Sequence, residues 1–339
     1  MKGRALGRTF HLKAITQPYY LFRPDQVLRR LRFWYRRPQA ADSSVALPWG
    51  LSIRCRSNDE IGYSLHTTGI YDLLLTEMIC RCVERGETVI DAGANIGYAT
   101  SLMAMLAGAG GRVYAFEPHP EIFLELRGNV ESWLRDPRVA AVELLESALS
   151  ESSGTAALRE PDSGFEANRG IASLDAKAGV CGKAYTVKTQ RLDEIISPNG
   201  APIGVWKIDV EGHELAAFQG AQLLLRSRRI RDIIFEEFSP YPAATHRLLE
   251  GCGYTTFHFE QGLLGPTLRR TGPGYHPPRY TPPNFLATLD QARMADKFRV
   301  RRWDWLSAGR RTSRSPGLIR RTPRAQELTH PVEPFLHGY

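Results

Sequence analysis

The sequence has 339 residues, of which 42% are hydrophobic, and a formal net charge of +8. These values are typical of a globular protein with one large domain or two small ones. No apolar run approaches the ~18–20 residues of a membrane span, and the first residues lack the basic-then-apolar pattern of a secretory signal. The sequence therefore predicts a cytoplasmic protein. Its five cysteines, an odd number without metal-ligand spacing, are expected to be reduced thiols and not to bind a metal.

The positive charge is concentrated at the two ends of the chain. Residues 1–40 carry a net +9 and residues 291–339 a net +7, which leaves −8 for the rest. We therefore predict a basic N-terminal extension at 1–44, a globular domain at 45–290 and a basic, disordered tail at 291–339. Such ends usually are solvated or pack on the domain, but they can also reach an anionic membrane or a nucleic acid.

In chain order, the domain begins with a small β lead-in at residues 45–70 and an amphipathic helix at 70–84. The β-branched run at 88–91 predicts a buried parallel strand, and a turn bracketed by Gly93 and Gly97 leads into a helix. Strand, glycine turn and helix N-terminus together form a ligand platform, because backbone N–H groups approach the ligand closely.

This turn is not the dinucleotide fingerprint, because Asn95 stands where that pattern needs a third glycine. Asp91 at the strand tip would repel a pyrophosphate and suits a cationic or amine-bearing ligand. The strand at 112–117 ends in Glu117, near the ~20-residue spacing at which such folds bind a ribose diol. Each acid alone could simply cap a turn or helix, but the two together favour S-adenosylmethionine. The predicted cofactor contacts are Asp91, Gly93, Ala94, Asn95, Gly97, Glu117, Pro118 and, after a third strand, Ser147 and Ala148.

The rest of the domain continues the alternation of strands and helices. The third strand is expected at 139–145, and a hairpin-like insertion at 151–200 is expected to lie over the carboxyl ends of the strands. Seven strands alternating with helices predict a doubly wound α/β sheet. The last four strands are expected at 205–210, 232–238, 254–259 and 284–288.

A second cluster of polar residues follows the fourth strand. Strand alternation places Lys207 and Asp209 on one face, and Glu211 and His213 lie in the turn beyond. We predict that Asp209, Glu211 and His213 are catalytic, because methyl transfer to a hydroxyl needs an aligned acceptor and a base. His213 is the natural base by its intrinsic pKa, with Asp209 or Glu211 orienting it. Alternatively, His213 is a surface residue at a helix start and Lys207 only neutralises the carboxylates.

These motifs resemble the FkbM-type methyltransferases, which are class I S-adenosylmethionine-dependent enzymes. The resemblance covers roughly residues 45–290 and implies a Rossmann-like, seven-stranded methyltransferase fold. It also implies that the cofactor residues named above bind S-adenosylmethionine, and that Asp209 and Glu211 face the catalytic cleft. Members of the family generally methylate hydroxyls of secondary metabolites or glycans. The matching segments are VIDAGANIGYAT, VYAFEPHPEIF, VKTQRLDEI, WKIDVEGHELAAFQGA and IIFEEF.

The leading interpretation is therefore an O-methyltransferase acting on a small molecule or saccharide. A nicotinamide-dependent oxidoreductase is an alternative, but the missing glycine and the charged turn argue against it. A nucleic-acid methyltransferase or binder is favoured only by the Arg-rich ends, and the core is acidic. The sequence does not name the acceptor, whose pocket the insertion is expected to shape, or the oligomeric state.

Overall fold

The structure is a computed structural model. The predicted disordered tail beyond residue 305, most of the predicted N-terminal extension and Cys181 lie outside the described residues. Membrane contact through the basic ends therefore stays a prediction. The described residues are 42–174, 182–197, 199–272, 274–275 and 283–305, together with residues 26, 28 and 35.

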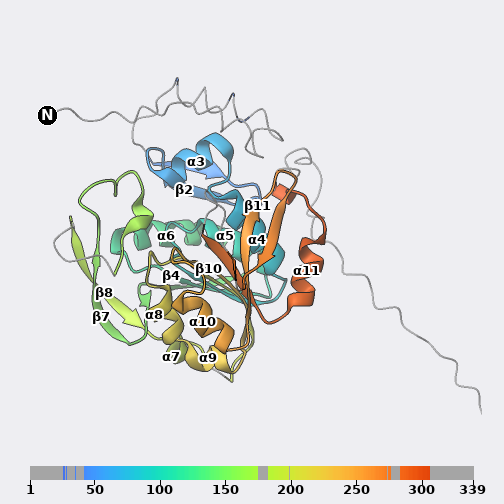
Figure 1. Ribbon diagram of the computed structural model, residues 1–339. Helices are drawn as coiled ribbons and strands as arrows, with labels where there is room; N and C mark the ends of the chain where they lie inside the picture. The colour runs from blue at the N-terminus through green and yellow to red at the C-terminus, as the bar shows by residue number, and fades with distance from the viewer. Residues whose placement is uncertain are drawn as a thin grey trace, which may run out of the picture.

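The centre of the domain is a sheet of eight strands (Figure 1). In spatial order the strands span Pro266–Arg270 (β12), Thr255–Gln261 (β11), Asn284–Thr288 (β13), Ile230–Glu236 (β10), Ile203–Ile208 (β9), Thr88–Ala92 (β3), Arg112–Phe116 (β4) and Ala141–Leu145 (β5). The five strands from β10 to β5 are parallel, whereas β13, β11 and β12 pair antiparallel. The order reverses between β9 and β3, the kind of switch point at which open α/β sheets bind ligands.

The prediction of a doubly wound, Rossmann-like α/β sheet is confirmed, but the count of seven strands is wrong. β12 is the eighth strand. It is the outermost strand of the sheet and forms a hairpin with β11. Its residues are half-buried or exposed after Pro266, so the sequence lacks the apolar alternation that signals a strand. Pairing with β11 makes this segment a strand.

Helices cover both faces of the sheet (Figure 1). One group consists of α4 (Leu73–Cys82), α5 (Tyr98–Ala107), α6 (Pro120–Trp133) and α11 (Gln291–Arg299). The other group consists of α7 (Leu192–Ile195), α8 (Glu214–Gln219), α9 (Gln222–Arg226) and α10 (Ala244–Gly251). Because strand residues alternate between the two faces, Val89 of β3 belongs to the core under the first group and Ile90 to the core under the second.

The N-terminal lead-in is a hairpin followed by a helix. β1 (Asp42–Ala46) pairs antiparallel with β2 (Ser52–Arg56), and α3 (Glu60–Thr68) follows. Asp59 caps α3, since its side chain accepts a hydrogen bond from Gly62 N at 2.7 Å. The helix was not expected in this lead-in, and the ordered domain begins before the predicted residue 45.

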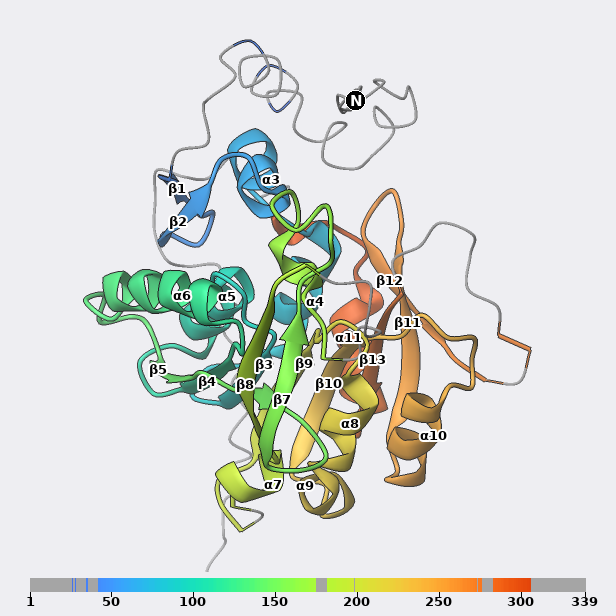
Figure 2. The same cartoon turned by 90° about the vertical axis from the view of Figure 1, so that its left-hand side faces the viewer.

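The insertion after β5 forms a small sheet of its own. It contains β6 (Ala148–Leu149), β7 (Gly154–Arg159) and β8 (Ala184–Gln190) in the order β6-β8-β7, with β7 and β8 antiparallel. Figure 2 shows β7 and β8 side by side in front of the central sheet. The hairpin-like insertion is thus present, and it also carries a short 3-10 helix, η2 (Arg169–Ile171).

The first part of the predicted disordered tail is ordered, so the prediction is wrong for residues 291–305. Helix α11 buries Met294 and Phe298, and Trp303 beyond it is only 2% exposed. Arg81 of α4 donates to the carbonyl of Lys297 at 2.7 Å and to that of Arg302 at 2.8 Å. The segment is Arg-rich, but its few apolar residues lie on one helix face and have α4 and β12 to pack against.

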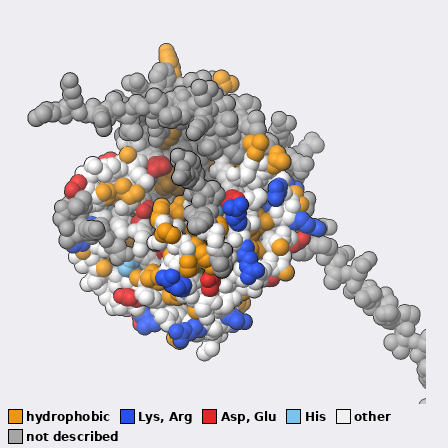
Figure 3. Space-filling view, viewed as in Figure 1, with side chains coloured by type: hydrophobic (Ala, Val, Ile, Leu, Met, Phe, Trp, Pro, Cys, Tyr) orange, Lys and Arg blue, Asp and Glu red, His pale blue; other side chains and the backbone are white. Residues whose placement is uncertain are grey.

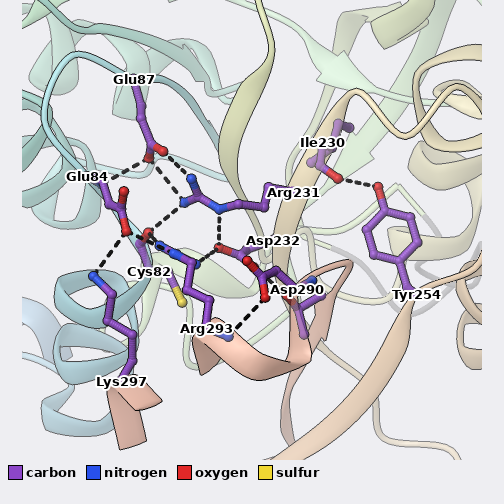
Figure 4. A network of polar contacts seen from close by, with 11 residues as sticks. Cys82, Glu84, Glu87, Ile230, Arg231, Asp232, Tyr254, Asp290, Arg293 and Lys297 are labelled. Carbon is purple, nitrogen blue, oxygen red and sulfur yellow. Dashed lines mark hydrogen bonds and ion pairs between the residues drawn. The ribbon is translucent and has the colours of Figure 1, made fainter. Parts of the chain in front are cut away.

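A network of charged side chains joins α11 to the amino ends of β3 and β10 (Figure 4). The buried Asp232 accepts hydrogen bonds from Arg231 Nε at 2.9 Å and from Arg293 Nη1 at 2.7 Å. Glu87 pairs with Arg231, and Glu84 pairs with Arg293 Nε at 2.8 Å. This network covers the side of the sheet at which the parallel strands begin, here called the amino edge. The opposite side, at which these strands end, is called the ligand-binding edge.

Basic and acidic side chains are intermixed on the surface. On the face seen in Figure 3, Lys and Arg side chains spread along the right side and the lower edge, with acidic side chains between them. On this face the described residues therefore form no single-sign patch of the kind that binds a nucleic-acid backbone. Within the same described part, no helix has both the length and the apolar character needed to cross a bilayer.

Candidate active site

A cleft opens at the carboxyl ends of β3, β4, β5 and β9, on the switch-point edge of the sheet. It encloses about 1040 Å³ of empty space, counting the part that is open to solvent. Its lining includes most of the predicted site residues: Gly93, Ala94, Asn95, Glu117, Pro118, Ser147, Ala148, Asp209, Glu211 and His213.

The turns after β3 and β9 approach each other at Gly93. Gly93 has φ +74°, and a Cβ there would lie 1.8 Å from the carbonyl oxygen of Asp209. Only glycine allows both the left-handed conformation and this contact. This contact joins the predicted cofactor turn to the predicted catalytic turn, and the close approach of the turn to a ligand stays a prediction.

Asp91 and Gly97 do not line the cleft. Asp91 is fully buried; Thr100 Oγ1 donates to its Oδ2 at 2.6 Å, and Lys207 Nζ lies 3.2 Å from its Oδ1. Gly97 has φ +99°, and a Cβ there would lie 2.8 Å from both Leu126 and Trp133. In this structure Asp91 anchors Lys207, and Gly97 lets α5 pack against α6. Direct contact of either residue with the cofactor stays a prediction.

Lys207 links the two turns. Its Nζ donates to the carbonyl of Gly93 at 2.8 Å and lies 3.8 Å from Asp209 Oδ2. Burial alone would lower the pKa of Lys207, but the charges of Asp91 and Asp209 outweigh burial and raise it. Lys207 thus stays charged and neutralises carboxylates, which is the alternative that the sequence left open for it.

Glu117 presents a carboxylate to the cleft from the tip of β4. Asn95 N donates to its Oε2 at 2.8 Å and His119 N donates to its Oε1 at 2.9 Å. A carboxylate has about four lone-pair sites, so each oxygen can accept one more hydrogen bond. Burial raises the pKa of Glu117 to about 7, although the two backbone N–H groups oppose the shift. Hydroxyl donors, as in a ribose diol, match this site.

Ser147 also fits a ligand in the cleft. It is 1% exposed, and its Oγ makes no hydrogen bond to any residue of the described chain. Buried hydroxyls in proteins are nearly always hydrogen-bonded. A cleft-lining hydroxyl without a protein partner therefore favours a polar ligand beside Ser147, next to Glu117.

Glu211 lies on the opposite wall in a strained backbone conformation. Its φ is +53°, a left-handed value that is uncommon for residues other than Gly, Asn and Asp. Burial, followed by the charges of Asp209 and Glu214, raises the pKa of Glu211 to about 7. Asn95, in the facing turn, is also left-handed at φ +50°. Strained residues cluster at functional sites because strain persists only where the surroundings impose it.

Asp209 and His213 flank Glu211 on this turn. The Asp209 side chain is 37% exposed and reaches solvent, whereas His213 Nε2 lies 3.0 Å from Ser150 Oγ. Glu214 holds the turn, since its Oε1 accepts hydrogen bonds from Val210 N at 3.1 Å and Gly212 N at 3.3 Å. The three predicted catalytic residues thus share one wall of the cleft, and their roles stay predictions.

The insertion covers the cleft between the two walls. A Cβ on Gly170 would lie 3.4 Å from Asn95 Nδ2 and 3.9 Å from Glu211 Oε1. Ser173 Oγ donates to the carbonyl of Glu211 at 2.8 Å. Arg169 donates from Nη1 to both carboxylate oxygens of Glu125 on α6 at 2.8 Å, which anchors η2. The expected position of the insertion over the strand ends is confirmed.

Several cleft residues were not found from the sequence. Tyr71 lies in the short segment between α3 and α4, and Arg169 and Gly170 come from the insertion. His119 is 1% exposed and stacks on Phe165 with ring centroids 5.4 Å apart. His119 follows Glu117 by two positions, and this proximity was the one available signal for it. The other residues reach the cleft only through tertiary packing.

The fold is an open α/β sheet whose switch-point cleft carries carboxylates on both walls. Residues 91–256 match the family described as Methyltransferase FkbM domain. The hexuronic acid methyltransferase AglP of Haloferax volcanii is 30% identical over 203 residues, which cover 58% of this chain and 77% of that protein. The 31-O-demethyl-FK506 methyltransferase FkbM of Streptomyces tacrolimicus is 30% identical over 209 residues, which cover 54% and 78%.

The chain belongs to the FkbM methyltransferase family and is an S-adenosylmethionine-dependent methyltransferase. This confirms the methyltransferase interpretation over the oxidoreductase alternative. Among solved structures, methyltransferase FkbM from Methylobacillus flagellatus aligns with 66% of this chain and 52% of that chain, at 14% identity and a TM-score of 0.35.

Proposed function

We propose that this protein methylates a hydroxyl oxygen of a small metabolite or saccharide. The observation that carries the proposal is the Glu211 carboxyl group on the cleft wall, across from the turn at Gly93 to Asn95. Hydroxyl groups stay protonated at neutral pH, so O-methylation gains from a base near the reacting oxygen. A carboxylate with a pKa of about 7 is matched to that task.

The residues on the facing walls suit the donor. Glu117 has free lone pairs for a ribose diol, and Ser147 offers a buried hydroxyl beside it. Asn95, between the walls, has an amide group that can bind the amino-acid part. S-adenosylmethionine supplies a methyl group bonded to a positively charged sulfur. The carboxylates of this cleft favour that charge.

The chain's own residues would then orient the acceptor and take its proton. Glu211 accepts the hydroxyl proton while the oxygen–carbon bond forms and the sulfur–carbon bond breaks. Asp209 orients the acceptor from the more exposed side of the turn. His213, held near Ser150, assists as a second proton acceptor, and η2 keeps water out of the cleft.

The relatives are consistent with an oxygen acceptor. One is named for a hexuronic acid and the other for 31-O-demethyl-FK506, and each name denotes methyl transfer. These names support the class of acceptor and do not identify the acceptor of this chain.

Substitution of Glu211 tests the proposal. Glu211→Gln should lower single-turnover methyl transfer by ~10²–10⁴-fold, the usual contribution of a general base. The acceptor probes are methyl glycosides, including a methyl glucuronide, and the product is analysed for an O-methyl group. Binding of S-adenosylhomocysteine, measured by calorimetry, should stay nearly unchanged. Glu151→Gln, at an exposed carboxyl group, is the matched control and should leave the rate unaffected.

Two results would contradict the proposal. Methyl transfer to nitrogen or sulfur acceptors but to none of the hydroxyl compounds would reject O-methylation. Full activity in Glu211→Gln would reject Glu211 as the base, and His213→Ala and Asp209→Asn would then be compared in the same assay.

A further inference from the structure

Two polar side chains lie beside each other where β10 and β13 reach the ligand-binding edge of the sheet. Glu236 and Asn284 are directly opposite in the antiparallel register. Side chains at such positions are on the same face, with Cβ atoms about 4.5–5.5 Å apart. The pair two positions away, Ile234 and Leu286, packs into the core under α4. Glu236 and Asn284 therefore point to the α4 side of the sheet.

Asn284 is buried without a full set of partners. It is 3% exposed, and its Nδ2 makes no hydrogen bond within the described part of the chain. An unpaired buried amide costs roughly 1–3 kcal/mol. In native proteins such groups usually bind a ligand or water that the bare chain does not show. The unpaired atom is the amide nitrogen, a hydrogen-bond donor.

The surroundings of this amide are rich in hydrogen-bond acceptors. Burial, and then the charges of Asp209, Asp72 and Glu211, raise the pKa of the neighbouring Glu236. Tyr71, next to Asp72 in the sequence, lines the cleft, and the Glu236–Asn284 pair lies behind this lining. The charges of Asp209 and Glu211 act on Glu236, so the pair is close to the wall that carries these two residues, on the side of the start of α4.

The chemistry of this cluster favours a neutral ligand with hydroxyl groups. Within the described residues, no group of three His, Cys, Asp or Glu side chains is arranged to hold a metal ion. A hydroxyl both donates and accepts, so one hydroxyl can donate to Glu236 and accept from Asn284. An anionic ligand would instead be repelled by the carboxylates.

We propose that Glu236 and Asn284 form an acceptor subsite that binds the hydroxyl adjacent to the one being methylated. This inference rests on the proposed O-methyltransferase function. The reacting hydroxyl faces Glu211 after β9, and its neighbour on the acceptor reaches Glu236 on the adjacent strand β10 and Asn284 on β13 beyond it. The enzyme would accordingly select vicinal diols over monohydric alcohols.

The test compares cis- and trans-cyclohexane-1,2-diol with cyclohexanol, using the full chain. Binding to the protein loaded with S-adenosylhomocysteine is measured by ligand-observed NMR, and methyl transfer is measured with labelled S-adenosylmethionine. The wild-type protein should prefer at least one diol by about tenfold or more in both measurements. A tenfold preference corresponds to about 1.4 kcal/mol, the size of one hydrogen bond.

Asn284→Leu should remove most of this preference by weakening diol binding and diol transfer. Asn284→Asp, which keeps the shape but loses the amide donor, should do the same and serves if the leucine variant does not fold. Asn199→Leu is the matched control: Asn199 is exposed and precedes the amino end of β9, at the opposite edge of the sheet. Its diol preference should equal that of the wild type.

The outcomes separate the two proposals. Methyl transfer to hydroxyls with no diol preference, or with a preference that survives in a folded Asn284 variant, overturns the subsite and leaves the proposed function standing. Diol binding that depends on Asn284, without transfer to any hydroxyl, supports the subsite and rejects the proposed function. If the protein neither binds a diol selectively nor methylates a hydroxyl, both are rejected.

Discussion

The two edges of the central sheet use charged side chains in opposite ways. At the amino ends of β3 and β10, carboxylates and guanidinium groups are paired, and Asp232 alone accepts three hydrogen bonds. Burial alone would raise the pKa of Glu84, but Arg293 and Lys297 outweigh burial and lower it to about 2. The charges at this edge stabilise the fold.

At the carboxyl ends of the same strands, polar groups are left in unfavourable states. Burial raises the pKa of Glu117 and of Glu211 to about 7, and Glu211 is held in left-handed backbone. Ser147 Oγ and Asn284 Nδ2 lack hydrogen-bond partners among the described residues. The difference teaches that one edge is built for stability, whereas the other keeps unsatisfied groups that a bound ligand or water can pair.

The largest expected effect comes from breaking the stabilising edge. Asp232→Ala leaves Arg231 and Arg293 without their shared acceptor and should lower the free energy of unfolding by about 3–5 kcal/mol, as for other broken buried pairs. The control is Glu143→Ala, which removes the exposed ion pair with Arg112 at 3.4 Å. This substitution should change the free energy of unfolding by less than about 1 kcal/mol. Urea unfolding measures both. Equal losses in the two variants would mean that the buried network stabilises the fold no more than an exposed ion pair does.

The next effect concerns the contact between the two ligand-binding turns. Gly93→Ala places a Cβ 1.8 Å from the carbonyl of Asp209, so the turns must separate. It should cost about 1–3 kcal/mol more than Gly86→Ala. Gly86 also has a positive φ, at +80°, but has open space around it, so it controls for backbone strain. Calorimetry should show loss of S-adenosylhomocysteine binding in Gly93→Ala only. Matching behaviour of the two variants would contradict the close-approach argument.

A smaller and opposite effect is expected from relieving strain at the ligand-binding edge. Glu211→Gly should raise the free energy of unfolding by about 1 kcal/mol, because glycine adopts the left-handed conformation without a steric penalty. Methyl transfer should be lost at the same time. Arg228→Gly is the matched control, since Arg228 has φ +55° on the exposed end of α9. It should be stabilised similarly and keep its activity; a stabilised and fully active Glu211→Gly would show that the strain serves no function.

The smallest effects are in the pH dependence of stability, where the two edges should differ in sign. The folded pKa of Glu211, about 7, is above its ordinary value of 4.5, so its stabilisation is present below pH 4.5 and lost as pH rises through 7. Glu84, at about 2, behaves in reverse: its stabilisation is present above pH 4.5 and lost as pH falls through 2. At pH 8, Glu211→Gln should therefore raise the melting temperature and Glu84→Gln should lower it.

Thermal unfolding at pH 8 and pH 4.5 checks this pair of predictions. The gain in Glu211→Gln should disappear at pH 4.5, and the loss in Glu84→Gln should become smaller there. If both variants shifted the melting temperature in the same direction at pH 8, the charges of Glu211 and Glu84 would not have opposite effects on stability.

Much of the fold and of the first ligand-binding turn could be predicted from the sequence, because their signals are local. The β-branched run of β3, Gly93 with its neighbours and the acid at Glu117 are all encoded within short stretches. The turn at Asp209, Glu211 and His213 stands out for the same reason. Periodicity of 2 or 3.6 residues specifies an element whenever its buried face is continuous.

The tertiary structure decided what depends on distant partners. Asp91 is at the predicted strand tip, but its partner Lys207 comes from β9, so only the assembled sheet shows that Asp91 anchors Lys207. β12 and α11 lack a strong pattern of their own and form because β11 and α4 offer surfaces to pair with. Likewise, only the antiparallel register of β10 and β13 brings Asn284 beside Glu236. A sequence specifies which face a residue takes in its own strand, whereas the neighbour across the sheet is chosen by the summed packing of the whole domain.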